Sequence, residues 1–279
     1  MHKAGEQTSV IMLTWNSSGH IRRGLQALLL QQREVALEIV VVDNGSTDST
    51  PSVVRELVPQ ARIILNTCNQ GVARARNQGV KVASGKYILF LDSDTEMAAG
   101  SLGDMVRFLE EHPPVGIVAP GLVSPDGSVQ FSCRRFPTVP GKLLRQLPLW
   151  LRRALPLVAD EELHSIDRSA ARPVDYVIGA CQLIRKEMLD QIGLLDERMF
   201  YGPEDVDLCL RAWQAGWQVY YLPPAIVMHS EQRITRRQPG TLTLKHALAL
   251  VYYFRKHRYF WRRPNPTKPV PHHGGGRMQ

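Results

Sequence analysis

The chain has 279 residues, of which 44% are hydrophobic and 22% charged, a composition typical of a globular protein with a substantial core. It contains no apolar run that approaches the roughly 18–20 residues of a membrane-spanning helix, and residues 1–9 are polar, unlike a signal peptide. Its four cysteines, Cys68, Cys133, Cys181 and Cys209, lack the spacing of a disulfide framework or a zinc site. We therefore expect reduced thiols, a cytoplasmic location and no structural zinc.

The net charge of +8 is concentrated near the end of the chain. Eleven of the 34 Lys and Arg residues follow Glu231, and no acidic residue does. Six aromatic residues lie between Tyr252 and Trp261, among several of these cations. The pattern suits an anionic partner, or a solvated helix end whose aromatic residues pack inward. Between nucleic acid and an anionic membrane, we expect peripheral contact of residues 255–263 with the inner face of the plasma membrane, and no nucleic acid.

Four strand-then-helix units fill the first part of the chain. The first helix places apolar residues at helical spacing, as at Ile21 and Leu25. The second begins at Pro51 with Thr50 as its N-cap, and Gly85 closes the third. Such a succession predicts a parallel sheet with helices on its faces. The expected strands are 9–14, 37–42, 63–65 and 87–91, and the expected helices are 21–32, 51–57, 71–83 and 101–112.

The second part of the chain is less regular. A strand over 115–119 leads into a hairpin whose turn is Pro125-Asp126-Gly127. Periodicity is lost over 132–172, where the basic and apolar segment 142–153 is broken by Pro148. This segment is either a lid or an interfacial membrane segment. Beyond it we expect strands at 174–178, 217–222 and 225–228 and helices at 186–192, 204–215 and 241–257.

Two carboxylates follow the fourth strand, at Asp92 and Asp94. In extended chain, residues two apart point to the same side, so both carboxylates would converge at the carboxyl end of the strand. Open α/β sheets bind ligands at that end, and paired carboxylates suit a divalent ion shared with a diphosphate. The alternative is a solvated turn or a cap of the following helix.

Several segments together resemble a known family. In the first half they are VIMLTWN (10–16), VVVDNGSTD (40–48), NQGVARARNQG (69–79) and LDSDT (91–95). In the second half they are GACQLIRKE (179–187), FYGPEDVDLCLR (200–211), AGW (215–217) and VMH (227–229). In this order they resemble the family 2 glycosyltransferases with the GT-A fold, in the branch of rhamnosyltransferases and galactofuranosyltransferases, over residues 8–258.

The resemblance implies one GT-A domain over residues 1–262. Its α/β fold would be a Rossmann-like, mostly parallel central sheet with helices on both faces, an acceptor-side subregion and a C-terminal helix. The nucleotide-binding half would cover about 8–120 and the acceptor and catalytic half about 121–258. Residues 263–279, rich in Pro, His and Gly, would be a disordered tail.

For the nucleotide, the resemblance places Thr14, Asn16 and Asp43 around the base and ribose. A carboxylate can accept the imide N–H of uracil or thymine, although Asp43 could instead only cap the turn that follows it. Arg76 and Asn77 would lie near the nucleotide or its phosphates, since a guanidinium pairs with phosphate oxygens. The alternative for Arg76 is a solvent-facing helix position.

For the metal, the resemblance implies Asp94 as a direct ligand and Asp92 as a ribose or water-mediated contact. His229 would complete the site, although a lone histidine is often structural or solvated. The ion would be Mg²⁺ or Mn²⁺, because oxygen ligands suit both and an imidazole favours Mn²⁺ slightly. Its role would be to neutralise charge on the departing nucleoside diphosphate.

For catalysis, the resemblance implies Asp205 as the general base. Glu204 would contact donor or acceptor hydroxyls, as would Gly179 and Ala180. The competing interpretation is that Glu204, Asp205 and Asp207 only supply negative charge to a helix N-terminus, which we expect to be the role of Asp207. Pro203 is inserted where relatives run Tyr-Gly-Glu-Asp, so this loop departs from the family pattern just before Asp205.

Together these features predict an inverting, metal-dependent glycosyltransferase. It would move rhamnose from dTDP-rhamnose, or a sugar from another dTDP- or UDP-linked donor, to a glycan or lipid-linked acceptor in cell-surface polysaccharide synthesis. A sugar-phosphate nucleotidyltransferase would need a Gly-rich basic loop after the first strand, which residues 15–18 do not provide. A catalytically silent binding protein would be expected to lack Asp94, Asp205 or His229, and all three are present.

Overall fold

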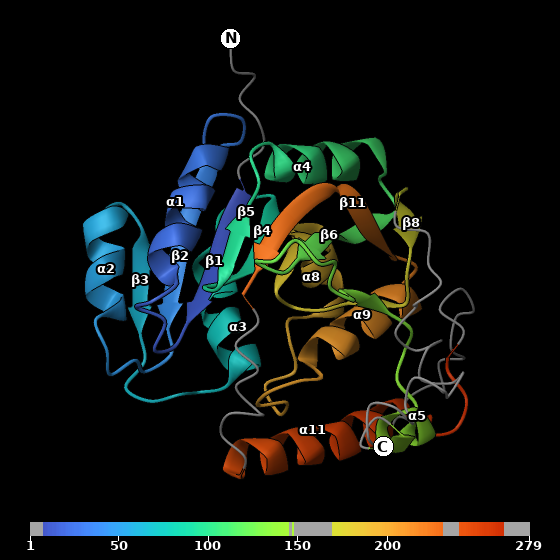
Figure 1. Cartoon of the computed structure of the whole chain (residues 1–279). Coiled ribbons are helices and arrows are strands. Elements are labelled where there is room, and N and C mark those ends of the chain that lie inside the picture. Colours follow the sequence, from blue (N-terminus) through green and yellow to red (C-terminus); the bar gives the residue numbers. More distant parts are fainter. Residues whose placement is uncertain (1–7, 145–146, 148–168, 231–239, 265–279) are drawn as a thin grey trace, which may run out of the picture.

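The computed structural model describes residues 8–144, 147, 169–230 and 240–264 (Figure 1). The strands are β1 (Thr8–Thr14), β2 (Leu37–Asp43), β3 (Arg62–Leu65), β4 (Tyr87–Asp92), β5 (Thr95–Met97), β6 (Val115–Val123), β7 (Cys133–Arg134), β8 (Arg172–Pro173), β9 (Tyr176–Val177), β10 (Cys181–Arg185) and β11 (Gln218–His229). The helices are α1 (Ile21–Gln31), α2 (Thr50–Leu57), α3 (Val72–Val82), α4 (Ser101–Glu111), α5 (Val139–Leu144), α8 (Lys186–Ile192), α9 (Glu204–Gln214) and α11 (Thr241–His257).

One nine-stranded mixed sheet runs through the molecule in the order β3-β2-β1-β4-β10-β6-β11-β5, with β8 paired to β11 (Figure 1). The first four strands in this order are mutually parallel, as the strand-then-helix pattern predicts. In their register Thr14 lies opposite Asp43, and Leu13 lies opposite Asp92. The carboxyl ends of β1, β2 and β4 therefore form one edge of the sheet.

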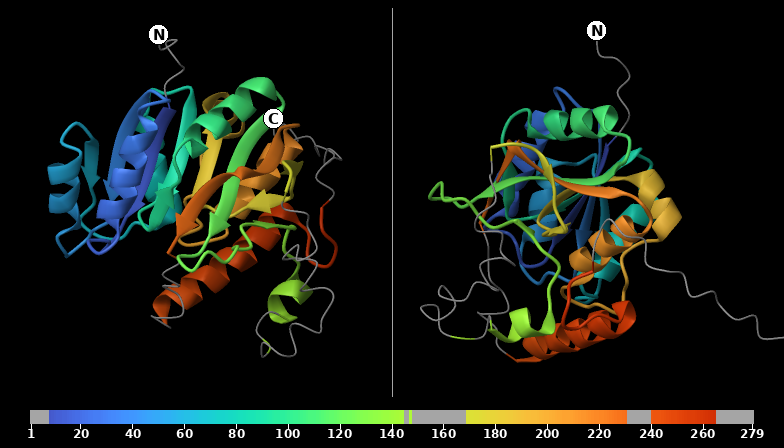
Figure 2. Two further views of the ribbon diagram at one scale, coloured as in Figure 1. Left: turned by 45° about the horizontal axis from the view of Figure 1, so that its top comes forward. Right: turned by 90° about the vertical axis from the view of Figure 1, so that its right-hand side faces the viewer.

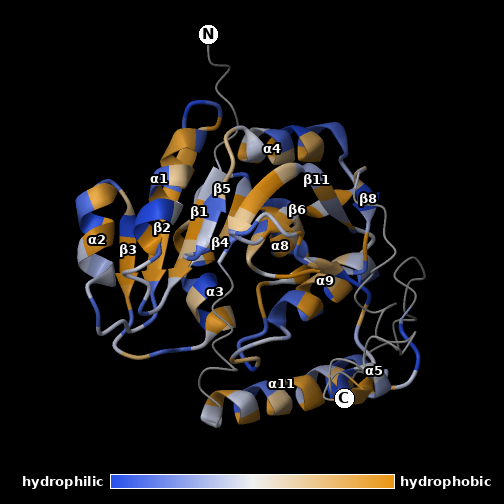
Figure 3. Cartoon of the chain, in the orientation of Figure 1, coloured by the Kyte–Doolittle hydropathy of each residue, from blue (hydrophilic) through white to orange (hydrophobic). Residues whose placement is uncertain are grey.

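Both faces of β1, β2 and β4 are largely buried, which explains their nearly continuous apolar runs, while β3 at the edge of the sheet is more exposed. Along β2, Val40 and Val42 pack into the core shared with α3 and α9, while Val41 packs into the core shared with α1 and α4. Figure 3 shows hydrophobic stretches along β1 to β3 with hydrophilic residues toward their ends, and Figure 2 shows helices on both sides of the sheet. The expected α/β architecture with helices on both faces is confirmed.

The sequence did not reveal β10, which lies between β4 and β6 and is antiparallel to both. This strand is fully buried, yet it carries two polar residues that obscure its apolar pattern. Gln182 donates to the Val177 carbonyl, and Arg185 donates to the Val115 and Leu109 carbonyls. Because backbone oxygens accept from these buried donors, the burial of both side chains is tolerated, although Gln182 Oε1 has no hydrogen-bond partner among the described residues.

The two strands expected near 217–222 and 225–228 are one strand, β11. Its register against β6 shifts between Leu222 and Ile226, around Pro223 and Pro224. Proline cannot donate to the ladder, so the irregularity falls where the sequence suggests a break. The expected hairpin turn at 125–127 is confirmed: Ser124 N–H donates to the Ser128 carbonyl, and Gly127 has φ 81°.

Two helix ends differ from expectation. Thr50 is the first residue of α2 rather than its cap, and the Asp48 carboxylate accepts its N–H at 3.0 Å. The α3 helix ends at Val82 and is followed by Ala83 in an extended conformation. Gly85 does not close the helix, because its N–H donates to the Ser9 hydroxyl. The expected strand over 174–178 is reduced to β9.

The α11 helix has the predicted bounds and packs beneath α9 (Figure 1). Its end lies beside the start of α5, where Val139 N–H donates to the Phe260 carbonyl at 2.9 Å. Most of the segment 142–153, and the tail from residue 265 onward, lie outside the described residues. Among the described residues, no helix has the length and hydropathy needed to cross a bilayer.

Candidate active site

The candidate site lies along the edge where β1, β2, β4 and β11 end. Thr14, Asp43, Asp92 and His229 are the last residues of these strands. Since β10 is antiparallel to both β4 and β6, and β11 is parallel to β6, all four strands point the same way. The topology therefore brings these four side chains, distant in sequence, to the ligand-binding edge of the sheet.

Asp92, Asp94 and His229 form a cluster that can hold a metal ion. Each offers one ligand atom, and these atoms lie within 4.8 Å of one another. We expected the two aspartates to converge because they lie on one extended strand, but this explanation is wrong. The β4 strand ends at Asp92, and Asp94 lies in the turn before β5. Pairing of His229 with Thr95 across β11 and β5 then sets the histidine beside Asp94. Two carboxylates and one imidazole suit Mn²⁺ or Mg²⁺.

Gln130 orients the histidine of this cluster. Its Nε2 donates to the His229 carbonyl at 2.8 Å and to the Ser124 hydroxyl, so its Oε1 faces His229 Nδ1 at 2.9 Å and can only accept. The proton therefore sits on Nδ1. This leaves the Nε2 lone pair toward Asp94, 3.6 Å from Oδ1, as a ligand position. Sequence reasoning missed Gln130, whose only signal was its place just after the hairpin turn.

Arg76 is buried rather than solvent-facing, so that alternative is wrong. Its Nη2 donates to Asp92 Oδ1 and to the Gly179 carbonyl, each at 2.7 Å, and its guanidinium lies over the ring of Phe90. Arg76 therefore holds Asp92 in place at the edge of the sheet. Contact with a phosphate stays a prediction.

Asn77 is buried on α3, facing a loop. Its amide Nδ2 donates to the Leu195 carbonyl at 2.8 Å and to Glu197 Oε1 at 3.0 Å. Its Oδ1 accepts the Leu195 N–H. A direct nucleotide contact through the amide nitrogen would require one of these bonds to break, because both donors are used. The arrangement points to a structural role in place of the expected nucleotide contact.

Two buried oxygens at the ends of β1 and β2 have no hydrogen-bond partner among the described residues. They are Thr14 Oγ1 and Asp43 Oδ2. The other oxygen of Asp43 accepts the Ser46 N–H at 2.9 Å, so this residue caps its turn and also presents a spare acceptor. Buried polar groups are rarely left unpaired unless a ligand or water satisfies them. This edge is therefore chemically suited to a nucleoside.

Asn16 shapes the loop beside these oxygens. It adopts the left-handed conformation, with φ 48°. Its N–H donates to the Ser46 hydroxyl and its Oδ1 accepts the Thr47 N–H, both at 2.8 Å. The loops after β1 and β2 are thus tied together, and a ribose contact by Asn16 stays a prediction.

Glu204 and Asp205 open α9 next to Gly179. Asp205 Oδ2 accepts the Gly179 N–H at 3.1 Å, and Oδ1 accepts the Val206 N–H at 2.8 Å. Gly179 also accepts from Arg76, and the Ala180 carbonyl accepts the Asp92 N–H. One short segment therefore connects the metal cluster to the helix that carries the expected base.

Glu204 is buried, and its Oε2 has no partner among the described residues. Burial raises the pKa of this carboxyl to about 7, with a further contribution from the negative charge of Asp205. Near neutral pH the group is therefore partly protonated and can both donate and accept hydrogen bonds. This property suits a contact with a sugar hydroxyl.

Asp207 does more than supply charge to the first turn of α9. Its Oδ2 accepts from Arg211 Nε at 2.8 Å, and its Oδ1 contacts Lys256 Nζ at 2.6 Å and His257 Nε2 at 2.8 Å. Burial alone would raise its pKa, but the His257 hydrogen bond and the charges of Arg211 and Lys256 lower it to about 2. Asp207 thus anchors α11 to α9.

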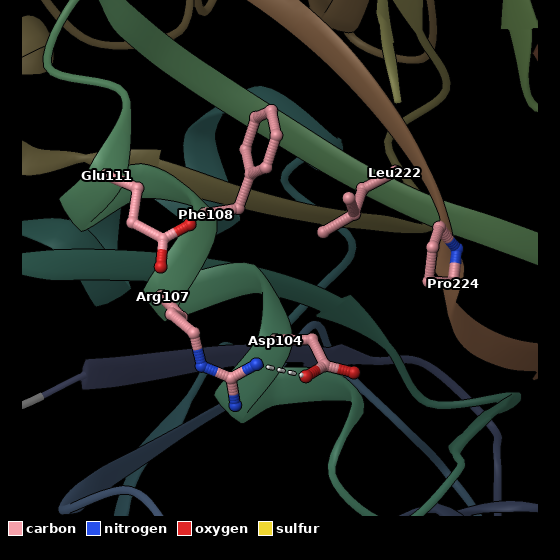
Figure 4. Close-up of a pocket in the computed structure, with 6 residues that line it drawn as sticks. All are labelled: Asp104, Arg107, Phe108, Glu111, Leu222 and Pro224. Atoms are coloured by element: carbon pink, nitrogen blue, oxygen red, sulfur yellow. Dashed lines mark hydrogen bonds and ion pairs between the residues drawn. The ribbon is translucent and has the colours of Figure 1, made fainter. Parts of the chain in front are cut away.

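A small hollow lies elsewhere, between α4 and the bend of β11 (Figure 4). An ion pair between Asp104 and Arg107 lies at its rim. It shares no residue with the site at the sheet edge, and its described lining residues include no metal cluster and no buried acceptor without a partner. Its lining residues are Asp104, Arg107, Phe108, Glu111, Leu222 and Pro224.

A comparison with sequence models of known families identifies the family of this chain. The sequence model described as "Glycosyl transferase family 2" matches residues 9–193, more than half of the chain. The chain belongs to glycosyl transferase family 2. The resemblance of the sequence motifs is thereby confirmed, and so is the class of nucleotide-sugar glycosyltransferase.

Among similar curated proteins is a Mycobacterium tuberculosis enzyme named N-acetylglucosaminyl-diphospho-decaprenol L-rhamnosyltransferase. It is 29% identical over 269 residues, which cover 91% of this chain and 86% of the relative. A pre-mycofactocin glycosyltransferase of the same organism is 29% identical over 236 residues, covering 81% of this chain and 43% of the relative.

Solved structures show the same fold. A mannosyltransferase from Pyrobaculum calidifontis in complex with GDP-Man and Mn²⁺ has a TM-score of 0.63 at 22% identity, covering 96% of this chain and 68% of that one. GalNAc-T7 with UDP, GalNAc and Mn²⁺ has a TM-score of 0.65 at 16% identity, covering 90% of this chain and 48% of that one. These likenesses establish the GT-A architecture of the family 2 chain.

Proposed function

We propose that this family 2 enzyme is an inverting, metal-dependent glycosyltransferase that moves rhamnose from dTDP-rhamnose to a lipid-linked acceptor. The observation that supports this proposal most directly is that Gly179 links Asp205 to the cluster of Asp92, Asp94 and His229. The mycobacterial rhamnosyltransferase, whose named acceptor is a diphospho-decaprenol-linked sugar, supports the choice of sugar and acceptor class.

The nucleoside would bind at the ends of β1 and β2. The unpartnered Asp43 Oδ2 is an acceptor for the imide N–H shared by thymine and uracil. Thr14 Oγ1 can donate to or accept from the nucleoside beside it. Because both oxygens are buried, a matched polar ligand would remove the free-energy cost of leaving them unpaired.

Asp94, His229 and Asp92 would hold the divalent ion. When bound, the ion neutralises negative charge that develops on the nucleoside diphosphate as it leaves. Arg76 fixes Asp92 through the 2.7 Å ion pair, and Gln130 fixes the tautomer of His229. The residues present therefore fit Mn²⁺ or Mg²⁺.

Asp205 would act on the acceptor. Two backbone N–H groups hold its carboxylate in one orientation at the start of α9. It would take the proton of the acceptor hydroxyl as that oxygen bonds to the anomeric carbon, while the bond to the diphosphate oxygen breaks and its electron pair leaves with the nucleotide. A single displacement of this kind inverts the anomeric configuration. Glu204 would form a hydrogen bond with a sugar hydroxyl.

The test is a donor and acceptor screen with mass-spectrometric detection of the product. We expect transfer from dTDP-rhamnose to polyprenyl-diphosphate-linked N-acetylglucosamine, and little from GDP-mannose. For Asp205→Asn we expect donor affinity to be retained and transfer to fall by roughly 10²–10⁴-fold. If donor binding collapses instead, Asp205 is a donor contact and the base lies elsewhere.

A lipid-linked acceptor lies at a membrane surface. We therefore also propose that the enzyme works there as a peripheral protein. Within the expected contact segment 255–263, Tyr259 is directed toward the protein, where it hydrogen-bonds to Tyr253. The three aromatic residues just before this segment also contact the protein, since Tyr253 and Phe254 are buried and Tyr252 donates to Asp196.

A further inference from the structure

The α11 helix is apolar on two opposite faces. On the inner face Ala249, Tyr253 and Phe254 are buried in the core shared with α9. On the outer face Leu244, Leu248 and Val251 are 61%, 60% and 53% exposed. Their spacing of four and three residues places them in one stripe along the helix. A solvent-facing stripe of this kind marks an interaction surface.

Positive charge continues the stripe. Arg255 follows at the next helical position, and Arg258 and Arg262 lie just beyond the helix; all three are exposed. Lys256 and His257 are not available to a partner, because both bind Asp207. Residues 240–264 contain no acidic side chain. The surface therefore combines apolar side chains with uncompensated cations, which suits an anionic lipid interface rather than a neutral one.

Two further exposed apolar residues extend the same region. Phe260 is 41% and Trp261 is 74% exposed just after α11. Leu143, on α5, is also exposed, and α5 begins beside Phe260. Figure 2 shows α5 and α11 at the same side of the molecule, away from the sheet. Aromatic rings at the end of a basic apolar helix are typical of residues at the depth of lipid headgroups.

The first turns of α11 also contact the loop that leads into the catalytic helix. His246 Nδ1 lies 3.0 Å from the Tyr201 carbonyl, and Lys245 Nζ lies 3.6 Å from the centre of the Phe200 ring. This loop ends at Glu204, where α9 begins. A surface formed by α11 therefore lies next to the expected acceptor side of the site.

We propose that the outer face of α11, formed by Leu244, Leu248, Val251 and Arg255, docks on an anionic membrane surface together with Trp261 just beyond the helix. The apolar stripe enters the interface, and the arginines pair with lipid phosphates. This inference deepens the peripheral location proposed above, but it requires neither the donor nor the acceptor assigned there. The binding it describes is measured without any transfer reaction.

The experiment is co-sedimentation of the full-length chain with vesicles of phosphatidylglycerol and phosphatidylcholine, or of phosphatidylcholine alone. We expect binding to the anionic vesicles that weakens in high salt. The triple variant Leu244→Gln, Leu248→Gln and Val251→Gln should bind about tenfold more weakly or worse, because it loses apolar area that would enter the interface. Arg255→Gln with Arg262→Gln should remove most of the preference for anionic lipid.

The matched control is Leu30→Gln, Leu65→Gln and Val129→Gln, at apolar residues that are 49%, 50% and 49% exposed elsewhere on the molecule. This variant should bind like the parent chain, and circular dichroism should show all variants folded. Equal binding of the α11 variant and its control would overturn the proposal, as would equal binding to neutral vesicles. Light scattering without vesicles tests whether the chain forms a dimer. A dimer that the α11 variant abolishes would also overturn the proposal, because this face would then be a contact between two copies of the chain.

Discussion

At the scale of single residues, the pair formed by Gln130 and His229 shows how an ordinary side chain can define a metal site. The glutamine amide is fixed by two acceptors, so it can only accept from the imidazole. The histidine is thereby held in one tautomer, with Nε2 toward Asp94. Partners of this kind commonly change metal affinity by 10–100-fold when they are removed.

We predict that Gln130→Ala weakens Mn²⁺ binding by roughly 10–100-fold and leaves the fold intact. Binding is measured by calorimetry or by the electron paramagnetic resonance of free Mn²⁺, with no turnover required. Ser124→Ala is the control, because it removes one acceptor of Gln130 Nε2 but leaves the contact with His229. Equal Mn²⁺ affinity in Gln130→Ala and the wild type would show that the glutamine does not position the ligand.

A second residue-scale prediction concerns the pH dependence of stability. The pKa of Glu204 is raised by burial to about 7, so the folded protein retains a proton that the unfolded chain releases near its usual pKa. Stability should therefore fall as pH rises from about 4.5 to 7, and the loss should be complete above 7. Glu204→Gln removes this titration. The free energy of unfolding of this variant minus that of the wild type should therefore be larger at pH 8 than at pH 4, by on the order of 3 kcal/mol.

Urea denaturation at several pH values measures this effect. Glu111→Gln, at an exposed position on α4, is the control and should show no such trend. A difference between Glu204→Gln and the wild type that stays constant from pH 4 to pH 8 would contradict the assignment of a proton to Glu204.

At the scale of elements, α11 is attached to α9 by charge as well as by packing. Asp207 is completely buried and contacts Lys256 and His257, while Lys256 also reaches Asp196 at 2.9 Å. The partners of Asp207 lower its pKa to about 2. Its contribution to stability is therefore complete above about pH 4 and is lost as pH falls toward 2.

We predict that Asp207→Asn lowers the free energy of unfolding at pH 7 by about 3–5 kcal/mol, because it breaks a buried charge network and leaves the cations uncompensated. The difference from the wild type should shrink between pH 4 and pH 2. Asp190→Asn is the control: it breaks the exposed pair with Lys186 and should cost about 0.5 kcal/mol or less. A loss at pH 7 no larger than in this control would show that Asp207 does not hold the two helices together.

The elements also show what the sequence could reveal. The strand-then-helix units of the first half were predictable because the centres of their strands are apolar and pack into the cores on both faces of the sheet. The strand β10 was not, because Gln182 and Arg185 interrupt its apolar pattern, and the backbone carbonyls that accept from Arg185 are about 70 residues away in the sequence. The two prolines in β11 suggested a chain break where the strand only shifts register.

At the scale of the whole molecule, the candidate site could be predicted in content but not in geometry. The Asp92 and Asp94 pair was indicated by its place at the end of an apolar strand, and Asp205 and His229 were indicated by the resemblance to family 2 glycosyltransferases. The position of His229 beside Asp94 depends on pairing between β5 and β11, which no local pattern encodes. The commitment of Asn77 to the loop at Leu195 was likewise invisible, since its partners are 118 residues or more away.

The central claim is that the cluster of Asp92, Asp94 and His229 binds a divalent ion that transfer requires. Acceptor-dependent release of nucleoside diphosphate from the donor tests it most directly, with Mn²⁺, with a chelator, and in Asp94→Asn. We predict that release needs both Mn²⁺ and acceptor, and that Asp94→Asn falls close to the blank with an unchanged circular dichroism spectrum. Release that persists at the wild-type rate in the chelator, or in Asp94→Asn, would contradict the claim.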